Sequence, residues 1–371
     1  MKIGVMLRTL EEKQGIGIYA RNLMRAILQL DHENHYFFMY TNRRQLGSFG
    51  IHKNLTEAVL GGKSKLVWDQ VSVPKYARAN GLDIVFNTKF SVPLLASCKT
   101  MMVLHGSEWY VHPEFYSKLD IIYNKIILPV YCRRATAISS VSKVTADDMV
   151  GFARINPKKV HVIHSAIADC FAPLTDSDTL ERIREKYRLP SKFILFVGKI
   201  YPGKNFKNIA RAFNKVKDKI DSTIKLVSVG DLRWSYDEDF RLIQELGIVD
   251  DIHFTGWVDQ EELPAIYSLA ELFLFPSFYE GFGIPILEAM ACGCPVVTAN
   301  TGACPEVADS AAVLVDPSNP DDIASGIATV LSDSKYRIEL KEKGIERAEQ
   351  FSWELSAKKT INIFQSLYKL S

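Results

Sequence analysis

Two glutamates eight residues apart, Glu280 and Glu288, bracket a glycine-containing turn in the second half of the chain. The turn follows an apolar run, and Pro285 suits the first turn of a helix, where a missing N–H costs nothing. Gly281 and Gly283 permit a close approach of the backbone to a ligand. The start of a helix also presents unpaired N–H groups and the positive end of the helix dipole. These features predict an anion-binding site.

The two carboxylates indicate which anionic ligand would fit. A carboxylate repels a phosphate but accepts paired hydrogen bonds from vicinal hydroxyl groups. A phosphate on the main-chain amides with a sugar on either side would satisfy both acids, and a nucleotide sugar has this layout. In the alternative interpretation, Glu280 caps the helix and Glu288 is solvated surface. We favour the site because strand, glycines, proline and both acids occur together.

A second cluster contains Lys199 and Lys204, between an apolar run and a helix expected to begin near Asn205. A nucleotide sugar that gives up its sugar leaves a nucleoside diphosphate, and cations directed at the developing charge lower the barrier to such a step. The position predicts that these lysines bind the leaving group. The alternative is two solvated loop lysines.

The segment Glu280 to Glu288 resembles the E-x7-E motif of the retaining glycosyltransferases of family 4, and the resemblance spans nearly the whole chain. It implies an α/β fold of GT-B type, with two Rossmann-like domains facing across a cleft and a C-terminal helix that crosses back to the first domain. It also implies that Glu280 contacts the transferred sugar, that Glu288 contacts the ribose, and that His105 lies beside the donor sugar.

The same resemblance implies a set of site residues. The catalytic residues would be His105, Lys204 and Glu280. The donor-binding residues would be Gly15, Gly17, Lys199, Lys204, Gly256, Trp257, Val258, Glu280, Gly281, Phe282, Gly283, Ile284, Ile286, Leu287 and Glu288. The amides of Gly283 and Ile284 would hold sugar hydroxyls, and those of Ile286 and Leu287 would lie near the diphosphate. No metal site and no cofactor are expected, because the nucleotide diphosphate sugar is a substrate.

Short apolar runs alternate with amphipathic segments along the chain, which is typical of parallel sheets flanked by helices. The predicted strands are 2–7, 36–41, 83–87, 100–104, 135–139 and 159–163, then 192–197, 224–229, 252–255, 272–275, 295–298 and 312–315. A polar linker is expected at 165–178. The domains are predicted as 1–171 for the acceptor, 172–352 for the donor, and 353–371 as a helix that packs on the first domain.

The composition fits an ordinary globular protein of two domains: 371 residues, of which 47% are hydrophobic and 24% charged. Its net charge of +2 hides an asymmetry, because residues 1–171 hold 22 Lys and Arg against 13 Asp and Glu, which leaves 23 against 30 for the remainder. A basic half attracts anionic partners such as phosphates or an acidic lipid surface.

The sequence lacks the patterns typical of disulfide-rich, metal-binding and membrane-spanning proteins. The six cysteines form no CxxC pair, which argues against a disulfide framework or a zinc site. The triplet 237–239 matches a D-x-D metal motif but is better interpreted as part of a polar loop before a helix that contains 240–246, where acids favour the N-terminal end of the helix dipole. The most apolar stretch, 121–132, contains Pro129 and is shorter than the roughly 20 residues of a membrane span. We expect a cytoplasmic protein without a nucleic acid partner, and the basic first half suggests an anionic surface at the inner membrane face as one candidate partner.

The predicted function is retaining transfer of a hexose, taken as mannose, to a glycan or lipid-linked acceptor in surface polysaccharide or glycolipid synthesis. A nucleotide-sugar epimerase of similar fold is an alternative that would release free sugar without an acceptor. An NAD-dependent oxidoreductase is another, because Gly15, Gly17 and Ala20 fit G-x-G-x-x-A. These glycines lie several residues beyond the first strand, however, and no acid ends the second strand.

Overall fold

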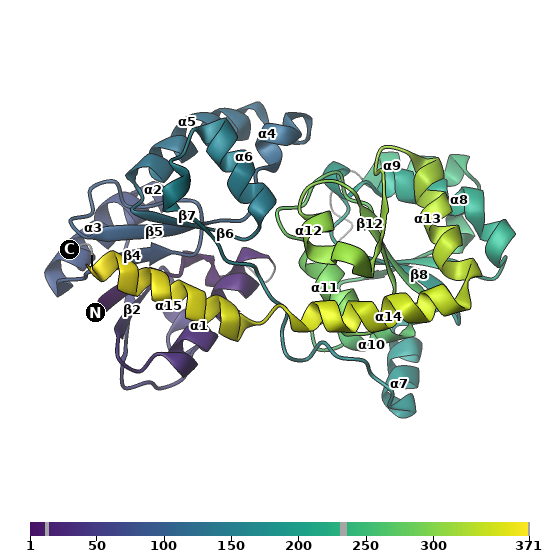
Figure 1. The fold of residues 1–371 in the computed structure, drawn as a ribbon, viewed down its shortest axis with the longest axis horizontal. Coiled ribbons are helices and arrows are strands. Elements are labelled where there is room, and N and C mark those ends of the chain that lie inside the picture. The colour runs from purple at the N-terminus through teal and green to yellow at the C-terminus, as the bar shows by residue number, and fades with distance from the viewer. Residues whose placement is uncertain (12–14, 231–235, 370–371) are drawn as a thin grey trace. The chain divides into compact units, whose positions relative to one another are not determined.

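The computed structural model describes residues 1–11, 15–230 and 236–369. The chain divides into two compact units (Figure 1). The first consists of Met1–Ala166 together with Ser352–Ser371, and the second is Ile167–Phe351. Each unit is a parallel β-sheet with helices packed on it, as expected for an α/β chain.

The first unit is built on a parallel sheet with the order β3-β2-β1-β4-β5-β6-β7 in the described residues. Its strands are β1 Lys2–Met6, β2 His35–Tyr40, β3 Leu55–Val59, β4 Ile84–Asn87, β5 Lys99–Leu104, β6 Ala137–Ser140 and β7 Val160–Val162. Its helices are α1 Ile16–Leu30, α2 Lys65–Val67, α3 Val73–Asn80, α4 Glu108–Val111, α5 Lys118–Arg134, α6 Lys143–Ala153 and α15 Trp353–Lys369.

The second unit repeats this architecture with the order β10-β9-β8-β11-β12-β13 in the part of the chain that is described. Its strands are β8 Phe193–Val197, β9 Lys225–Val229, β10 Ile252–Gly256, β11 Leu272–Phe275, β12 Val296–Ala299 and β13 Val313–Val315. Its helices are α7 Ser177–Tyr187, α8 Phe206–Ile220, α9 Tyr236–Glu245, α10 Leu263–Leu269, α11 Ile284–Ala291, α12 Cys304–Ala308, α13 Pro320–Ser332 and α14 Ser334–Glu349.

The predicted strands are confirmed, and one strand was missed. Central strands such as β11, in which all four side chains are buried, read as continuous apolar runs because helices cover both faces of a parallel sheet. The missed strand, β3, lies at the sheet edge, and all five of its residues are only partly buried. Its mixed sequence, which includes Glu57, therefore lacks the apolar run that identified the others.

Helix α15 belongs to the first unit, where it packs against α1 (Figure 1). The fully buried ring of Phe364 meets Phe86 of β4 edge-on, with ring centroids 5.4 Å apart. The hydroxyl of Ser356 donates to the carbonyl of His164 at 2.7 Å. The expectation that the last helix returns to the first domain is thus confirmed. No helix in the described residues is long and apolar enough to cross a membrane.

Replacing Phe364 by Ala should destabilise the first unit by about 3–5 kcal/mol, because the substitution removes a fully buried aromatic ring and leaves a cavity. Urea denaturation measures the loss. The matched control is Tyr368→Ala, on the same helix but 47% exposed, which should change stability by less than about 1 kcal/mol. Equal losses in the two variants would mean that α15 does not contribute to the core of this unit.

Candidate functional site

Glycines end three neighbouring strands of the second unit and bring their loops into main-chain contact. The N–H of Gly198, after β8, donates to the carbonyl of Val229 at 2.8 Å, and the N–H of Gly230 donates to that of Gly256 at 2.9 Å. A Cβ at Gly230 would lie 2.3 Å from the carbonyl oxygen of Gly198, so no larger residue fits there. Ligands of α/β sheets bind at the carboxyl edge of the sheet. At this edge the loops of the second unit pack main chain against main chain.

The loop that carries Lys204 is fixed by Asn205, the residue between a 3-10 turn at Pro202–Lys204 and helix α8. Asn205 is buried and has a left-handed backbone, with φ of 63°. Its amide nitrogen donates to the carbonyls of Pro276 at 2.9 Å and Pro317 at 2.6 Å. The Lys204 loop is thereby tied to two other loops at the same edge of the sheet.

The loop with the two glutamates joins β11 to α11. Gly283 precedes the helix with φ of 97°, a conformation that favours glycine, and Pro285 lies in the first turn as expected. The carbonyl of Glu280 accepts the N–H of Ala303 at 3.0 Å, and the N–H of Phe278 donates to the carbonyl of Gly203 at 3.0 Å. The loop between β11 and α11 is therefore joined by main-chain hydrogen bonds to the Lys204 loop and to the loop that follows β12.

These ties place Lys204 against Glu280. The Nζ atom of Lys204 lies 2.6 Å from Oε1 of Glu280, and the two side chains are only 15% and 13% exposed. The same ammonium group lies 4.5 Å from the centre of the Phe275 ring. The predicted cation and the predicted sugar-binding acid are thus neighbours in one poorly solvated site, beside the start of α11. A charge held there acts more strongly than one in water.

Glu288, on α11, accepts a hydrogen bond from the hydroxyl of Tyr267 on α10 at 3.0 Å. Burial raises the pKa of Glu288 to about 7, and the bond from Tyr267 opposes that rise. Tyr267 is itself fully buried, so its hydroxyl is held in one position. Glu288 can therefore serve as an acceptor whose charge changes near neutral pH.

The remaining predicted residues of the second unit differ in exposure. Lys199 is exposed, and Trp257 is half exposed and donates from Nε1 to Asp259 at 3.3 Å. By contrast, four predicted residues have buried side chains, Val258, Phe282, Ile286 and Leu287. Any contact of these four with a polar ligand would be through their backbones. The N–H of Ile286 already donates to the carbonyl of Gly283 at 2.9 Å.

In the first unit, His105 follows β5 and is held on three sides. Its Nε2 atom lies 2.8 Å from the carbonyl oxygen of Thr88, and since a carbonyl only accepts, the ring carries its proton on Nε2. The rings of Tyr19 and Phe90 meet it edge-on, with centroids 4.7 and 5.7 Å away. Tyr19 lies on α1, whose first turn contains the buried Gly17 and follows the exposed Gly15.

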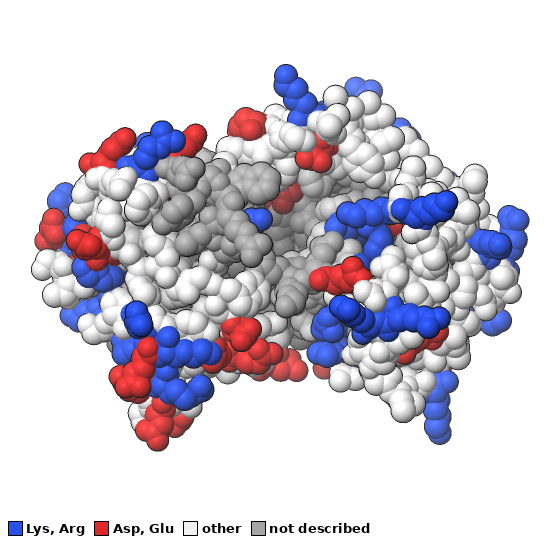
Figure 2. All heavy atoms as spheres, turned by 180° about the vertical axis from the view of Figure 1, so that it is seen from behind, with Lys and Arg blue, Asp and Glu red and all other residues white. Residues whose placement is uncertain are grey.

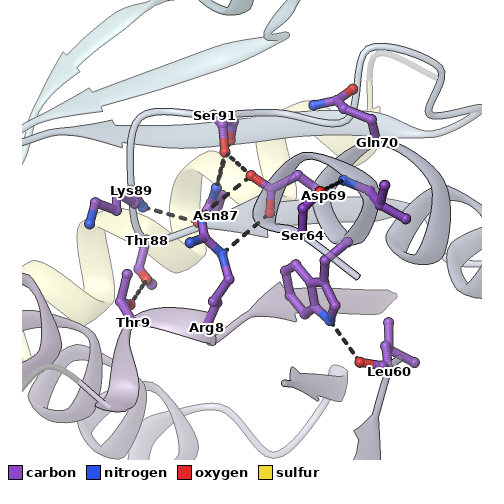
Figure 3. Close-up of polar contacts among 12 residues, drawn as sticks. Arg8, Thr9, Leu60, Ser64, Asp69, Gln70, Asn87, Thr88, Lys89 and Ser91 are labelled. Carbon is purple, nitrogen blue, oxygen red and sulfur yellow. Dashed lines mark hydrogen bonds and ion pairs between the residues drawn. The ribbon is translucent and has the colours of Figure 1, made fainter. Parts of the chain in front are cut away.

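A polar cluster that sequence reasoning missed lies after β1 and β4 (Figure 3). The guanidinium group of Arg8 lies 3.5 Å from the carboxylate of Asp69, which also accepts from the hydroxyl of Ser91 at 2.8 Å. The amide of Asn87 donates to that hydroxyl at 2.9 Å. Burial raises the pKa of Asp69, and Arg8 opposes this rise. Asp69, Asn87 and Ser91 are buried, whereas the side chain of Arg8 is 21% exposed, so Arg8 is the member of the cluster that a ligand can reach.

The D-x-D triplet, predicted in a loop before a helix, lies in the first turn of α9, where acids still meet the positive end of the helix dipole. Glu238 pairs with Lys207 at 2.6 Å, and Asp239 is buried, which raises its pKa to about 6. The side chain of Asp237 lies outside the described residues. Within those residues, no three His, Cys, Asp or Glu side chains are grouped as metal ligands.

Comparison with known protein families identifies the family of this chain. The family described as Glycosyl transferases group 1 matches residues 179–347, and the family described as Glycosyltransferase Family 4 matches residues 13–169. The N-acetylgalactosamine-N,N'-diacetylbacillosaminyl-diphospho-undecaprenol 4-alpha-N-acetylgalactosaminyltransferase of Campylobacter jejuni is 30% identical over 302 residues, 77% of each chain. The chain belongs to glycosyltransferase family 4. It is thus a glycosyltransferase, and these relatives give no support to the epimerase alternative.

Other members of the family include mannosyltransferases. O-antigen chain mannosyltransferase B of Escherichia coli is 29% identical over 270 residues, which is 72% of this chain and 71% of the relative. The serotype-specific mannosyltransferase WbdA of the same species is 31% identical over 278 residues, and this chain covers 33% of its length.

Solved structures of glycosyltransferases share the fold and confirm the GT-B architecture. Sucrose-phosphate synthase of Thermosynechococcus elongatus superposes with a TM-score of 0.80 at 19% identity, with both chains covered completely. Anabaena HepE, crystallised with UDP and glucose, superposes with a TM-score of 0.78 at 17% identity over 99% of this chain and all of that one. At these identities the likeness concerns the fold alone.

The raised pKa of Glu288 predicts a pH-dependent stability difference between the wild type and Glu288→Gln. The folded protein binds a proton at this carboxyl up to about pH 7, whereas the unfolded chain releases it near 4.5. Wild-type stability from this group is therefore present below about pH 4.5 and is lost as the pH rises to about 7. Glutamine has no charge to bury, and it can still accept from Tyr267.

Unfolding free energies of the two proteins at about pH 5 and about pH 8 test this prediction. The wild type should lose roughly 2 kcal/mol relative to Glu288→Gln over that interval. The matched control is Glu339→Gln, an exposed surface acid paired with Lys343, whose difference from the wild type should vary little. A constant difference for Glu288→Gln would show that the carboxyl titrates at its ordinary pH.

Proposed function

We propose that this family 4 glycosyltransferase is a retaining hexosyltransferase that moves a mannose from a nucleotide diphosphate sugar to an acceptor hydroxyl, in the assembly of a surface polysaccharide or glycolipid. The observation that carries the proposal is the enclosed Lys204–Glu280 pair at 2.6 Å beside the start of α11. The pair places an ammonium group that can bind a leaving diphosphate beside a carboxylate that can accept hydrogen bonds from sugar hydroxyls.

Mannose as the transferred sugar is supported by the relatives. The printed activities of O-antigen chain mannosyltransferase B and of WbdA are mannosyl transfer, at identities of 29% and 31%. A lipid-linked acceptor is supported by the Campylobacter relative, whose name includes a diphospho-undecaprenol. Nucleotide-sugar donors are supported by the HepE structures, one of which holds UDP-glucose.

In the proposed mechanism the donor diphosphate takes the place of Glu280 at Lys204. The carboxylate of Glu280 then accepts from hydroxyls of the transferred sugar, and Glu288 accepts from the ribose. The bond from the anomeric carbon to the phosphate oxygen breaks, and a bond to the acceptor oxygen forms on the same face. The acceptor proton passes to the leaving diphosphate, whose charge is met by Lys204, by Lys199 and by the start of α11 without a metal.

The acceptor is assigned to the first unit. Its sheet ends in the cluster of Arg8, Asp69, Asn87 and Ser91, which are side chains suited to hydrogen bonds with hydroxyl groups (Figure 3). His105 bonds the carbonyl of Thr88, the neighbour of Asn87, so the histidine contacts the loop that follows β4 and carries Ser91. We assign His105 to hydrogen bonds with the transferred sugar, as the family resemblance implied.

Lys204→Ala should lower kcat by about 100-fold, because the variant loses a preorganised cation that faces the developing diphosphate charge. Donor affinity, measured by calorimetry, should fall by less than about tenfold, since Lys199 and the helix start remain. A panel of UDP, GDP, ADP and dTDP in a thermal-shift assay first identifies the base to use in that measurement.

The matched control is Lys215→Ala, which removes a lysine of α8 that pairs with Asp321 on the surface. It should keep both kcat and donor affinity within about twofold of the wild type. A Lys204→Ala enzyme with unchanged kcat and weakened donor binding would contradict the transition-state role. Release of free sugar from donor alone by the wild type, with no need for an acceptor, would contradict transfer.

For the acceptor assignment, we expect the double variant Arg8→Gln/Asp69→Asn to raise the acceptor KM by about tenfold or more, because charged hydrogen-bonding groups are lost. Both charges are removed together so that neither is left buried without its partner. The donor KM and the melting temperature are the controls and should stay close to those of the wild type. An unchanged acceptor KM would remove this cluster from the acceptor site.

A further inference from the structure

Tyr267 on α10 meets the carboxyl group of Glu288 from within the core of the second unit. Its hydroxyl donates to Oε2 of Glu288 at 3.0 Å, and its side chain is fully buried. Glu288 itself is only partly buried, so part of this residue is accessible. The hydroxyl therefore holds the carboxylate from its buried side, while the acid can still meet a ligand.

The Tyr267 ring is held by packing against two other rings. Phe171, in the segment that precedes α7, meets it edge-on with ring centroids 6.1 Å apart, and Phe273 of β11 does so at 5.4 Å. The hydroxyl of the next residue, Ser268, accepts the N–H of Leu174 at 3.0 Å, which ties the same segment to α10. A ring that is closely packed in this way keeps one rotamer. The tyrosine hydroxyl therefore has a fixed position, and it imposes an orientation on the carboxylate that it bonds.

The charge of Glu288 depends on burial and on this hydrogen bond. Burial raises the pKa of Glu288 to about 7, and the bond from Tyr267 opposes that rise. The thiols of Cys170 and Cys292 also face this carboxyl, but burial raises the pKa of both, so they are neutral at that pH. In α10, β11 and β12, which are described throughout, Tyr267 is the one titratable residue.

Charges on the other helices that pack against α11 are directed elsewhere. On α12, Glu306 is partly exposed, and on α14 four charged residues have other partners. These partners are Glu271 for Arg337, Cys294 for Lys341, Glu339 for Lys343, and the carbonyls of Glu306 and Val307 for Arg347. Exposed side chains of both charges are spread over the face of the molecule seen in Figure 2, where water and salt screen them. The bond from Tyr267 is therefore the contact through which a single residue can shift the charge of Glu288.

We propose that Tyr267 is a positioning residue, whose hydroxyl orients the carboxylate of Glu288 toward the vicinal hydroxyls of the donor ribose and favours its charged form. Each carboxylate oxygen can accept more than one hydrogen bond, so the bond from Tyr267 leaves acceptor capacity for the ribose. A donor to the charged form favours that form over the neutral acid, and a charged acceptor binds hydroxyls more strongly. This role rests on the proposed function, in which Glu288 accepts from the ribose. It makes nucleotide affinity depend on pH and on the 2′-hydroxyl.

Calorimetric titration without acceptor tests the proposal, with whichever of UDP, GDP and ADP the thermal-shift panel selects. At about pH 7, Tyr267→Phe should raise the Kd by about five- to tenfold, because less of Glu288 is charged once its donor is lost. At about pH 9, where Glu288 is largely charged in both proteins, the loss should be below about threefold. The titration of the ligand itself cancels, since both proteins meet the same ligand at each pH. The matched control is Tyr36→Phe, whose buried hydroxyl donates to Asp31 of the first unit at 2.6 Å, and it should bind as the wild type does at both pH values.

A double-variant cycle shows whether Tyr267 acts through Glu288. Glu288→Ala should raise the Kd by about tenfold or more at about pH 9, because a charged acceptor is lost. Adding Tyr267→Phe to that variant should change the Kd by less than about twofold, because no carboxylate is left to orient. Thermal unfolding without nucleotide shows that each variant is folded. Equal losses from Tyr267→Phe in the two backgrounds, or equal losses at the two pH values, would overturn the proposal.

The sugar of the nucleotide and the turnover rate supply two further readouts. At about pH 7 the wild type should bind the ribonucleotide about tenfold more tightly than its 2′-deoxy form, and Tyr267→Phe should discriminate less. With donor and acceptor present, Tyr267→Phe should raise the donor KM and leave kcat within about threefold of the wild type, because the ribose is remote from the bond that breaks. A fall in kcat with an unchanged donor KM would contradict a positioning role at the ribose.

Three results keep this proposal separate from the proposed function. If Glu288→Ala binds nucleotide as the wild type does, the proposed ribose contact fails and the role of Tyr267 fails with it. If Glu288→Ala weakens binding but Tyr267→Phe binds as the wild type does, the positioning role alone is overturned. If nucleotide binding follows the expected pattern but no sugar is transferred to any acceptor, the positioning role stands and the proposed transfer fails.

Discussion

The ion pair between Lys204 and Glu280 is the interaction that the surrounding site in the second unit must stabilise. Each charge is largely removed from water, and such a pair is stable only if its geometry is good and its remaining groups are satisfied. The ring of Phe275 supplies a face for the ammonium group, and the start of α11 supplies a positive dipole for the carboxylate. On the proposed function, Glu280 holds this cation in place until a donor phosphate replaces the carboxylate.

The pair can keep this geometry because the loops around it are joined through main-chain atoms. Asn205 bonds the carbonyls of two other loops, and Ala303 bonds the carbonyl of Glu280. Gly302, with φ of 58°, allows its segment to approach the backbone of Glu280 closely. A Cβ at this position would lie 2.9 Å from the N–H nitrogen of Glu280. Because main-chain hydrogen bonds already hold these loops, little conformational entropy is lost when a ligand binds. The site is therefore preorganised.

What the sequence could predict was local, and what it could not predict was contact between distant segments. Apolar runs identified β11 and the other buried strands, and the spacing of Glu280 and Glu288 identified the loop between strand and helix. The bond from Tyr267 to Glu288 and the pair of Arg8 with Asp69, 61 residues apart, depend on how strands are ordered in the sheets. The exposure of apolar residues on α5 was also out of reach, because an apolar stretch does not show which of its residues a neighbouring element covers.

The net charge of the second unit does not determine which ligand that unit can bind. Residues 172–371 carry more acids than bases, yet the proposed donor is a diphosphate. Screening confines exposed charges to about 8 Å at physiological ionic strength, so on the proposed function donor binding would depend on the few groups that touch the donor, Lys204 and the start of α11 among them. An acidic second unit would therefore bind an anionic donor through local contacts, whereas the net basic charge of the first unit would act on a partner that meets many charges at once within that distance.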